Sequence, residues 1–417
     1  MARIIMKYVF ITLAMTMWSA QLQADVITDW NEASLKIIRE EKVPPPAAAR
    51  LMAMVHLAMF EAVNADERLY APYGVTLAAF PKNASQRLSA SQAAYTVLAT
   101  LYPNFKSRLD RLQSQTEAGT ISLTTIKESR AFGRTIGAAV LEARHKDGSD
   151  RTVHHDGGTN AGEWRPTPPA FQPAYAPHWL LVKPFGIQSG DQFRKTVMPS
   201  LTSDDYANAY LDVMLLGSKN SSHRTPEQTE IAHFWADGPG TSTPPGHWNM
   251  IAQGIVKKTR PHLLQSARLF AHLNMALADA AIVSWDMKYT YNFWRPITAI
   301  RDADSDQNPA TVADTLWEPL LTTPPFPECT SGHSTFSGAA ANVLAQFIGS
   351  DSYNFSTTSD ALPGVVRQFT SFSSAAAEAG ISRIYGGIHF NFSNVDGVSM
   401  GQEVAEYILR NQLTPNL

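Results

Sequence analysis

The sequence contains little cysteine, no excess of charge of one sign and few long apolar runs. Cys329 is the only cysteine among 417 residues, so no disulfide can form within the chain and its fold must depend on its core. The 34 basic and 37 acidic residues nearly balance and form no block of like charge, which argues against a nucleic-acid or membrane-surface partner. Any cationic site must therefore be local.

The first 24 residues resemble a secretory signal peptide. Arg3 and Lys7 give a basic start, residues 8–17 are mostly apolar, and residues 22–24 end on alanine, where cleavage is plausible. An uncleaved anchor is the alternative, but this apolar run is only about half as long as a membrane-spanning helix requires. The sequence thus predicts an exported protein, periplasmic or secreted, with no membrane partner after signal cleavage. No other stretch looks long and apolar enough to cross a bilayer.

Helical periodicity dominates the rest of the chain. Apolar residues recur at three- and four-residue steps from Leu51 to Ala62, directly after the prolines at 44–46, which predicts a helix. Clear alternation is hard to find, so strands should be few. The fold class is therefore predicted to be all-α, with two four-helix-type bundles. Similar helical patterns occupy residues 90–101, 121–144, 206–216, 264–288, 334–348, 365–380 and 402–409.

A passage rich in glycine and proline, residues 147–190, interrupts this pattern. Such a composition breaks helices and predicts an ordered loop. It divides the chain beyond residue 24 into an N-terminal helical half, 25–190, and a C-terminal bundle, 191–417. The same passage contains Asp147, Asp150 and the run 154–156, whose carboxylates and imidazoles could bind a divalent metal. Their spacing fits no known metal loop, so a polar turn is the better interpretation.

Three short segments in the last third of the chain carry residues suited to binding an anion. The first contains Lys288 and Arg295, followed by Pro296. Seven residues are about two helical turns, so both cations would project from one face of a helix that Pro296 ends or kinks. Such pairs are also common on solvated helices.

The second segment, Ser331-Gly332-His333, follows a proline-rich break at 322–327 and precedes a helical pattern. Main-chain N–H groups at a helix start can bind an anion, and glycine lets the backbone approach it closely. The plainer alternative is that Ser331 caps the helix and His333 lies on the surface.

The third segment contains Arg383, Gly386-Gly387 and His389. Paired glycines are costly inside a helix, so they indicate a tight approach or a break near the histidine. A core histidine bonded to a backbone carbonyl is the alternative. Together, the three segments supply the cations that a buried, multiply charged oxyanion requires.

The order K-x6-RP, SGH and SR-x5-H resembles that of the vanadium-dependent haloperoxidases, in particular their bacterial secreted branch. The same fold is shared with the acid and lipid-phosphate phosphatases of the PAP2 type. The resemblance extends from about residue 278 to 397 and includes Trp285 and the residues 325–327 that precede the SGH motif.

The resemblance implies a vanadate cofactor, with hydrogen peroxide and a halide as substrates and a hypohalous species as product. His389 would be the metal ligand and His333 the acid-base residue, while Trp285 and Phe326 would line the halide side of the site. The metal would act as a Lewis acid toward peroxide. The vanadate oxygens would be bound by Lys288, Arg295, Arg383, Ser331 and Gly332.

Two positions depart from the family's pattern. Thr330 stands where proline is common, which could loosen the turn before Ser331. Ser393 stands where the family often has an aspartate, the usual partner that orients a metal-bound histidine. Asp396 is the nearby carboxylate that could replace it.

Two other functions use the same residues. In a PAP2-type phosphatase, which needs no vanadate, His389 would attack a phosphomonoester to form a phosphohistidine, and His333 would protonate the leaving alcohol. Ser393 slightly disfavours this reading, because the nucleophile would lack its orienting carboxylate. A non-catalytic oxyanion-binding protein is the third hypothesis, and His333 argues against it because simple binding needs no acid-base residue.

Overall fold

The computed structural model describes residues 25–416 except 75–78, 121 and 196–197. The predicted signal peptide lies outside the described residues. Within them the chain is mostly helical, with one two-stranded sheet, which confirms the all-α class. The division at residue 190 stays a prediction.

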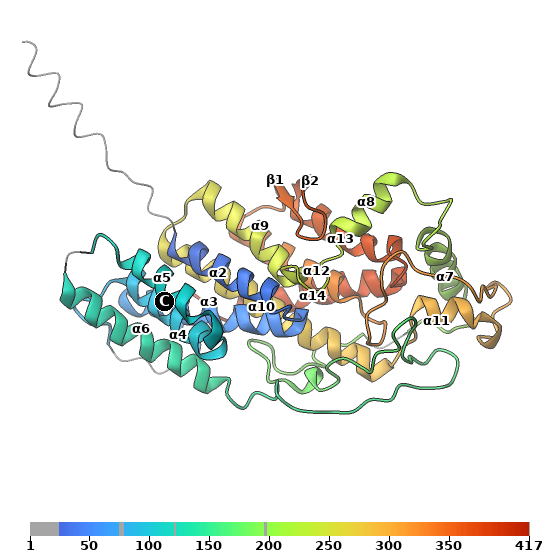
Figure 1. Ribbon diagram of the computed structural model, residues 1–417, viewed down its shortest axis with the longest axis horizontal. Coiled ribbons are helices and arrows are strands. Elements are labelled where there is room, and N and C mark those ends of the chain that lie inside the picture. Colours follow the sequence, from blue (N-terminus) through green and yellow to red (C-terminus); the bar gives the residue numbers. More distant parts are fainter. Residues whose placement is uncertain (1–24, 75–78, 121, 196–197, 417) are drawn as a thin grey trace, which may run out of the picture.

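The first group of helices packs at one end of the elongated molecule, drawn in blue to teal in Figure 1. In it α3 contacts α4 and α6, and it also contacts α10 of the second group. The helices of this group are α2 (Val26–Glu40), α3 (Pro45–Glu67), α4 (Gln86–Leu101), α5 (Lys106–Glu117) and α6 (Leu123–Ala143).

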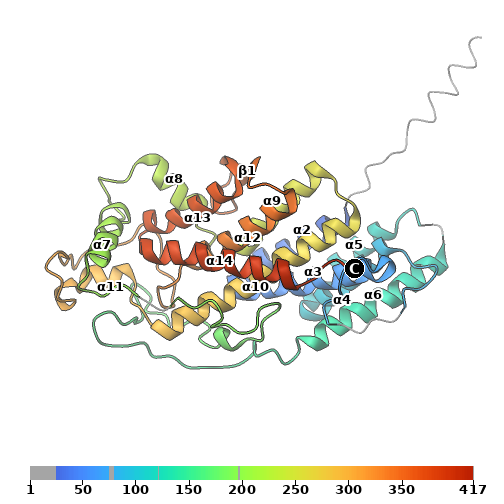
Figure 2. The same cartoon turned by 180° about the vertical axis from the view of Figure 1, so that it is seen from behind.

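The second group is built around α10, which is 29 residues long and contacts both α12 and α14. From behind, α14 runs beside α10, and α13 lies on the other side of α14 (Figure 2). The group comprises α7 (Asp204–Leu216), α8 (Pro226–Phe234), α9 (Thr243–Thr259), α10 (Leu263–Tyr291), α11 (Pro296–Arg301), α12 (Gly332–Ile348), α13 (Phe372–Tyr385) and α14 (Asn391–Asn411).

Helix α3 corrects one expectation from the sequence. By length and composition it is apolar enough to cross a membrane, but 89% of its most apolar window is buried inside the protein. It packs between α4, α6 and α10, so its hydrophobic surface is covered on several sides. A helix that is apolar on all sides in this way is typical of the core of a large helical protein.

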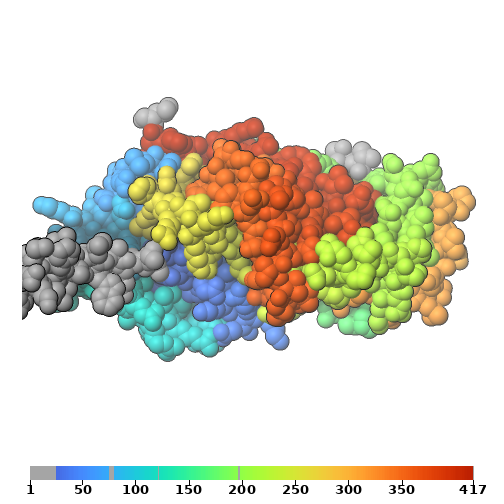
Figure 3. Space-filling view, turned by 90° about the horizontal axis from the view of Figure 1, so that it is seen from above, coloured from blue at the N-terminus to red at the C-terminus, as the bar shows by residue number. Residues whose placement is uncertain are grey.

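The helix predicted over residues 365–380 is only partly correct. Residues Val366–Ser371 form β2, which pairs antiparallel with β1 (Ser352–Thr358), and α13 begins only at Phe372. Alternating burial in both strands shows that the period here is two rather than three to four. On the face shown in Figure 3 this orange hairpin lies between the yellow α9 and the yellow-green α8.

Side-chain caps mark where many helices begin. A serine, threonine or aspartate accepts a hydrogen bond from a backbone N–H of the first turn, which satisfies a group that has no partner within the helix. In α8 the cap is a full capping box between Thr225 and Gln228. Other caps are Asp25, Ser85, Ser122, Ser203, Ser331 and Ser371.

The loop predicted over residues 147–190 is present and contains one short 3-10 helix, Trp179–Leu181. It runs along the flank of the molecule below α10 (Figure 1). Asp279 of α10 anchors it, since its carboxylate accepts the N–H groups of Phe185, Gly186 and Ile187 at 2.6, 2.7 and 2.9 Å. The loop is therefore held to the second group of helices from inside the protein.

We expect Asp279→Ala to lower the free energy of unfolding by about 2 kcal/mol or more, because three backbone N–H groups lose their acceptor. Urea unfolding followed by circular dichroism measures this change. Asp212→Ala, on the exposed side of α7, is the control and should change stability by less than about 0.5 kcal/mol. Equal unfolding midpoints in the two variants would show that Asp279 does not anchor the loop.

Candidate active site

The three predicted segments meet where α10 ends and α12 begins. Lys288 lies in the last turn of α10, and Arg295 is the residue before α11. Arg383 lies in the last turn of α13, and His389 lies in the short connection from α13 to α14. Lys288, Arg295, Arg383 and His389 are each at most 2% exposed.

Lys288 and Arg295 do not lie on one helix, contrary to the prediction. Helix α10 ends at Tyr291, and Asn292 adopts a left-handed conformation with φ of 48°. Arg295 is extended, with ψ of 154°, as expected for a residue that precedes proline. The two cations are close because the chain turns between them. Their proximity affects Lys288, whose pKa is lowered first by burial and then by the charge of Arg295.

His389 lies between an arginine and a carboxylate. Its Nδ1 is 2.8 Å from Oε1 of Glu328, and its Nε2 is 3.1 Å from Nη1 of Arg295. A guanidinium can only donate, so Nε2 must carry a lone pair and the proton must be on Nδ1, which donates to Glu328. This tautomer is the one in which Nε2 can bind a metal.

His333 is paired with the other arginine. Nη1 of Arg383 is 3.3 Å from Nε2 of His333, which is therefore the acceptor. Burial, followed by the charge of Arg383, lowers the pKa of His333 well below its ordinary value. His333 is thus a neutral base. It is half-buried, whereas Arg383 is fully buried.

Lys288 holds the segment before α12 in place. Its ammonium group donates to the backbone carbonyls of Pro327 at 3.3 Å and Glu328 at 3.0 Å, and also to that of Thr330. An ammonium has three protons, so a bond from Lys288 to an oxyanion requires the exchange of one of these partners. Its charge acts at the site in either case.

Ser331 and Gly332 form the start of α12, as predicted. The Ser331 hydroxyl accepts from the backbone N–H of Ser334 at 3.3 Å, so the simpler capping role is real. The N–H groups of Gly332 and His333 precede the first hydrogen bond of the helix and carry its positive dipole end. A Cβ added at Gly332 would lie in ordinary van der Waals contact, 3.8 Å from the rings of Phe336 and Trp285, so the segment packs closely against these aromatic side chains.

The aromatic pair lies against the cations. The rings of Trp285 and Phe326 are 5.1 Å apart, and Nζ of Lys288 is 5.0 Å from the Phe326 ring centre. The guanidinium of Arg295 is 4.9 Å from the same ring. The apolar wall predicted for the halide side is therefore next to the buried cations Lys288, Arg295 and Arg383, which together with the start of α12 we call the cage.

Gly386 and Gly387 show both features that their sequence predicts. Gly386 follows the last residue of α13, and Gly387 has a φ of 77°, which favours glycine. A Cβ at Gly387 would lie 2.3 Å from the carbonyl oxygen of Gly217. The break lets the chain leave α13 and present His389 to Arg295.

The cage has more positive than negative charge. Glu328 lies beside Lys288 and Arg295, and Asp237 lies near Arg383 but is also 3.2 Å from Nδ1 of His247. Three buried cations thus face two carboxylates. Burial lowers the pKa of both Arg295 and Arg383 to about 10, because removal from water disfavours their charged forms. An anion bound beside them would compensate this positive charge.

Both acidic residues near the cations, Glu328 and Asp237, were missed in the sequence. Glu328 lies five residues before His333, and Asp237 precedes a glycine-rich turn, so neither stands at a position that the three motifs mark. Asp396, the expected replacement carboxylate, instead lies near Lys195 and Glu403. Only the tertiary structure brings Glu328 to the histidine.

The polar side chains of the long loop are engaged in ion pairs. Asp147 binds Arg50 and Arg144, and His154 pairs with Asp156 in a highly exposed position. Across the described residues no cluster of three or more His, Cys, Asp or Glu side chains is placed to hold a metal ion.

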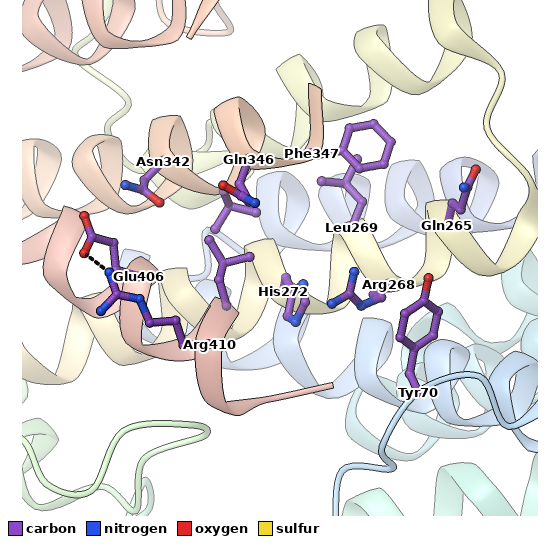
Figure 4. A pocket seen from close by; sticks show the side chains of 12 residues that line it. Tyr70, Gln265, Arg268, Leu269, His272, Asn342, Gln346, Phe347, Glu406 and Arg410 are labelled. Atoms are coloured by element: carbon purple, nitrogen blue, oxygen red, sulfur yellow. Dashed lines mark hydrogen bonds and ion pairs between the residues drawn. The ribbon is translucent and has the colours of Figure 1, made fainter. Parts of the chain in front are cut away.

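A surface pocket of about 660 Å³ lies elsewhere, between α10, α12 and α14. Arg268 and His272 of α10 line it together with Glu406 and Arg410 of α14 (Figure 4). It shares no residue with the cage, and its polar groups are partly engaged: His272 bonds the carbonyl of Gln412 at 2.9 Å. It is not part of the candidate active site.

Comparisons with known proteins agree with this geometry. The family described as the VCPO second helical-bundle domain matches residues 268–414. A crystal structure of a bacterial vanadium-dependent iodoperoxidase superposes with a TM-score of 0.81 at 28% identity, covering 94% of this chain and 98% of that one. Residues 268–414 thus carry a vanadium chloroperoxidase-type domain, and the chain as a whole is similar to vanadium-dependent haloperoxidases.

Two further similar proteins match over a shorter stretch or at lower identity. The vanadium chloroperoxidase of Curvularia inaequalis is 35% identical over 145 residues, which is 31% of this chain but only 24% of that protein. The matched part therefore spans about a quarter of the curated relative. A bacterial vanadium-dependent chloroperoxidase shares the fold, with a TM-score of 0.70 at 15% identity over 88% of this chain and 93% of that one.

We expect Arg383→Ala to weaken the binding of inorganic phosphate, a tetrahedral oxyanion, by about tenfold or more, because a buried charge-assisted hydrogen bond is worth about 1.5–3 kcal/mol. Isothermal titration calorimetry measures the dissociation constant. Arg301→Ala, which removes a half-buried arginine of α11 bonded to the carbonyl of Trp317, is the matched control. Equal phosphate affinity in the two variants would place the anion outside this cage.

Proposed function

We propose that this protein is a vanadate-dependent haloperoxidase that uses hydrogen peroxide to oxidise a halide to a hypohalous species. The observation that carries the proposal is the state of His389. Its Nε2 lone pair faces the cationic cage while its Nδ1 proton is held by Glu328. His389 can bind a metal through Nε2 only in this tautomer. The similarity to vanadium-dependent haloperoxidases indicates which metal.

The residues present fit vanadate. Nη2 of Arg295 is a buried donor without a hydrogen-bond partner among the described residues, and so is the indole N–H of Trp285. The N-terminus of α12 adds the backbone N–H groups of Gly332 and His333, which have no partner within the helix. An orphaned guanidinium N–H, an excess of positive charge and a helix N-terminus together suit an oxyanion better than a bare cation.

In this proposal Lys288, Arg295, Arg383, Ser331 and Gly332 would hold vanadate, and His389 would be the metal ligand. Bound there, vanadate would supply a Lewis-acid centre that activates peroxide. His333 would accept a proton at Nε2, in exchange for its hydrogen bond from Arg383, and would later return it. Trp285 and Phe326 exclude water from the halide side.

A phosphomonoesterase remains the second candidate, for one specific reason. The same cage would suit phosphate, and Glu328 supplies the orienting carboxylate that Ser393 lacks, so the argument from Ser393 against a nucleophilic His389 no longer holds. The relatives named above are haloperoxidases, which favours the first function. A single preparation can distinguish the two.

We expect the purified protein to oxidise iodide or bromide with hydrogen peroxide only after orthovanadate is added. His389→Ala should lose both vanadate binding and activity, because the metal ligand is gone. His333→Ala should still bind vanadate but lose about a hundredfold or more in turnover, as removal of an acid-base residue does. Triiodide absorbance measures turnover, and calorimetry measures vanadate binding.

Two results would count against this function. Halide oxidation that is unchanged in His389→Ala would exclude a vanadate site at this histidine. Hydrolysis of an aryl phosphate without vanadate, lost in the same variant and accompanied by no halide oxidation, would establish the phosphatase instead.

We further propose that residues 1–24 direct export and that the mature protein is periplasmic or secreted. The basic start and the short apolar run support this proposal. Mass spectrometry of the protein recovered from its native cells should find an N-terminus near residue 25. An intact Met1 on the protein, found in the cytoplasmic fraction, would overturn it.

A further inference from the structure

We infer that Glu328 is the positioning residue for His389, and that it replaces from the segment before α12 the carboxylate that the family usually places on the chain after the histidine. The inference rests on the proposed function, in which His389 is the ligand of vanadate. It assigns to Glu328 the work of setting the orientation and basicity of that ligand.

The hydrogen bonds of Glu328 fix the histidine on two sides. One oxygen, Oε1, accepts Nδ1–H of His389 at 2.8 Å and the backbone N–H of Phe390 at 2.9 Å. The imidazole and the main chain that carries it are therefore bonded to a single atom. Glu328 is itself 0% exposed, and its backbone is held by the N–H···O bond to the carbonyl of Phe293 at 2.9 Å and by Lys288 at its carbonyl.

Ser393 marks the position from which the carboxylate is missing. Its hydroxyl is buried beside the Glu328 side chain, and both Oγ of Ser393 and Oε2 of Glu328 have no hydrogen-bond partner of normal geometry among the described residues. Ser393 thus lies next to the carboxyl group of Glu328, at the position where the family often has an aspartate. A serine fits where a second carboxylate would repel the first.

Asp396 does not take this role. It is half-buried on α14, and the charges that act on it are those of Lys195 and Glu403. Neither lies in the cage. The choice between the two carboxylates is therefore decided by geometry, although Asp396 is nearer to His389 in sequence.

A carboxylate on Nδ1 has two effects on the opposite nitrogen. It keeps the proton away from Nε2, and its charge makes the Nε2 lone pair a stronger donor to a metal. It also has an electrostatic effect of opposite sign, because a negative charge near the cage opposes the binding of any anion. The two effects separate when two oxyanions are compared, since vanadate bonds to the histidine and phosphate only needs the cations.

The test compares Glu328→Gln with the wild-type holoenzyme and apoprotein at pH 8. We expect vanadate to bind about tenfold or more weakly in the variant, as loss of such a partner to a ligand does, while inorganic phosphate binds equally or more tightly. Calorimetry gives both constants. Loss of affinity for both anions, or a gain for both, would overturn the inference, because neither pattern follows from a change at the histidine alone.

Asp396→Asn is the matched control, since it makes the same carboxylate-to-amide change on the neighbouring segment. It should leave both affinities within about twofold, well below the tenfold effect expected at the histidine partner. If Asp396→Asn weakens the binding of vanadate more than Glu328→Gln does, the positioning residue is Asp396.

Moving the carboxylate gives a stronger check. The double variant Glu328→Ala/Ser393→Asp should bind vanadate more tightly than Glu328→Ala. No recovery of vanadate binding would argue for a purely structural Glu328.

A spectroscopic readout decides the question without any bound oxyanion. In protein labelled with ¹⁵N-histidine, the Nδ1–H proton of His389, assigned with His389→Gln, should resonate far downfield because it donates to a carboxylate. It should move upfield in Glu328→Gln and not in Asp396→Asn. An unshifted resonance in Glu328→Gln would overturn the inference, whereas failure of the wild type to bind vanadate would refute only the proposed function.

Discussion

The site depends on the burial of three cations, Lys288, Arg295 and Arg383, in a helical protein. Buried positive charges are tolerated only where hydrogen bonds and opposite charges compensate them. Much of that compensation comes from backbone carbonyls: those of Pro327 and Glu328 for Lys288, and those of Phe326 and Ile388, each at 2.8 Å, for Arg295. The segments before α12 and after α13 are thus held by the same side chains that attract the anion.

Each histidine of the site is set by an arginine. Arg295 faces Nε2 of His389, and Arg383 faces Nε2 of His333. Because a guanidinium always donates, both imidazoles are kept neutral with their Nε2 lone pairs toward the cage. They differ in what lies behind them. His389 has the carboxylate of Glu328, which suits a ligand, whereas His333 is more exposed, which suits proton transfer.

The long loop contributes support rather than chemistry. Two backbone hydrogen bonds connect the loop to the surroundings of the site. The N–H of Trp164 donates to the carbonyl of Asn292 at 2.7 Å, and the N–H of Tyr175 donates to that of Pro325 at 2.8 Å. Asp279 holds its far end against α10. The turn between Lys288 and Arg295 and the segment that carries Phe326 are therefore braced from outside, and a catalytic geometry built on loops and helix ends gains rigidity from this covering.

The sequence by itself determined the helical class, the start of α12 at Ser331-Gly332, the break at Gly386-Gly387 and the identities of the cations and histidines, because caps, glycines and motif spacing are local properties. Tertiary structure decided the rest. The apolar stretches within residues 352–371 are too short for their pattern to distinguish a strand from a helix. Their antiparallel pairing makes this segment a hairpin. The placement of Lys288 and Arg295 followed from a chain reversal at Asn292, not from helical spacing. The partner of His389 came from Glu328, 61 residues away, since proximity in space between separate helices is not written in sequence distance.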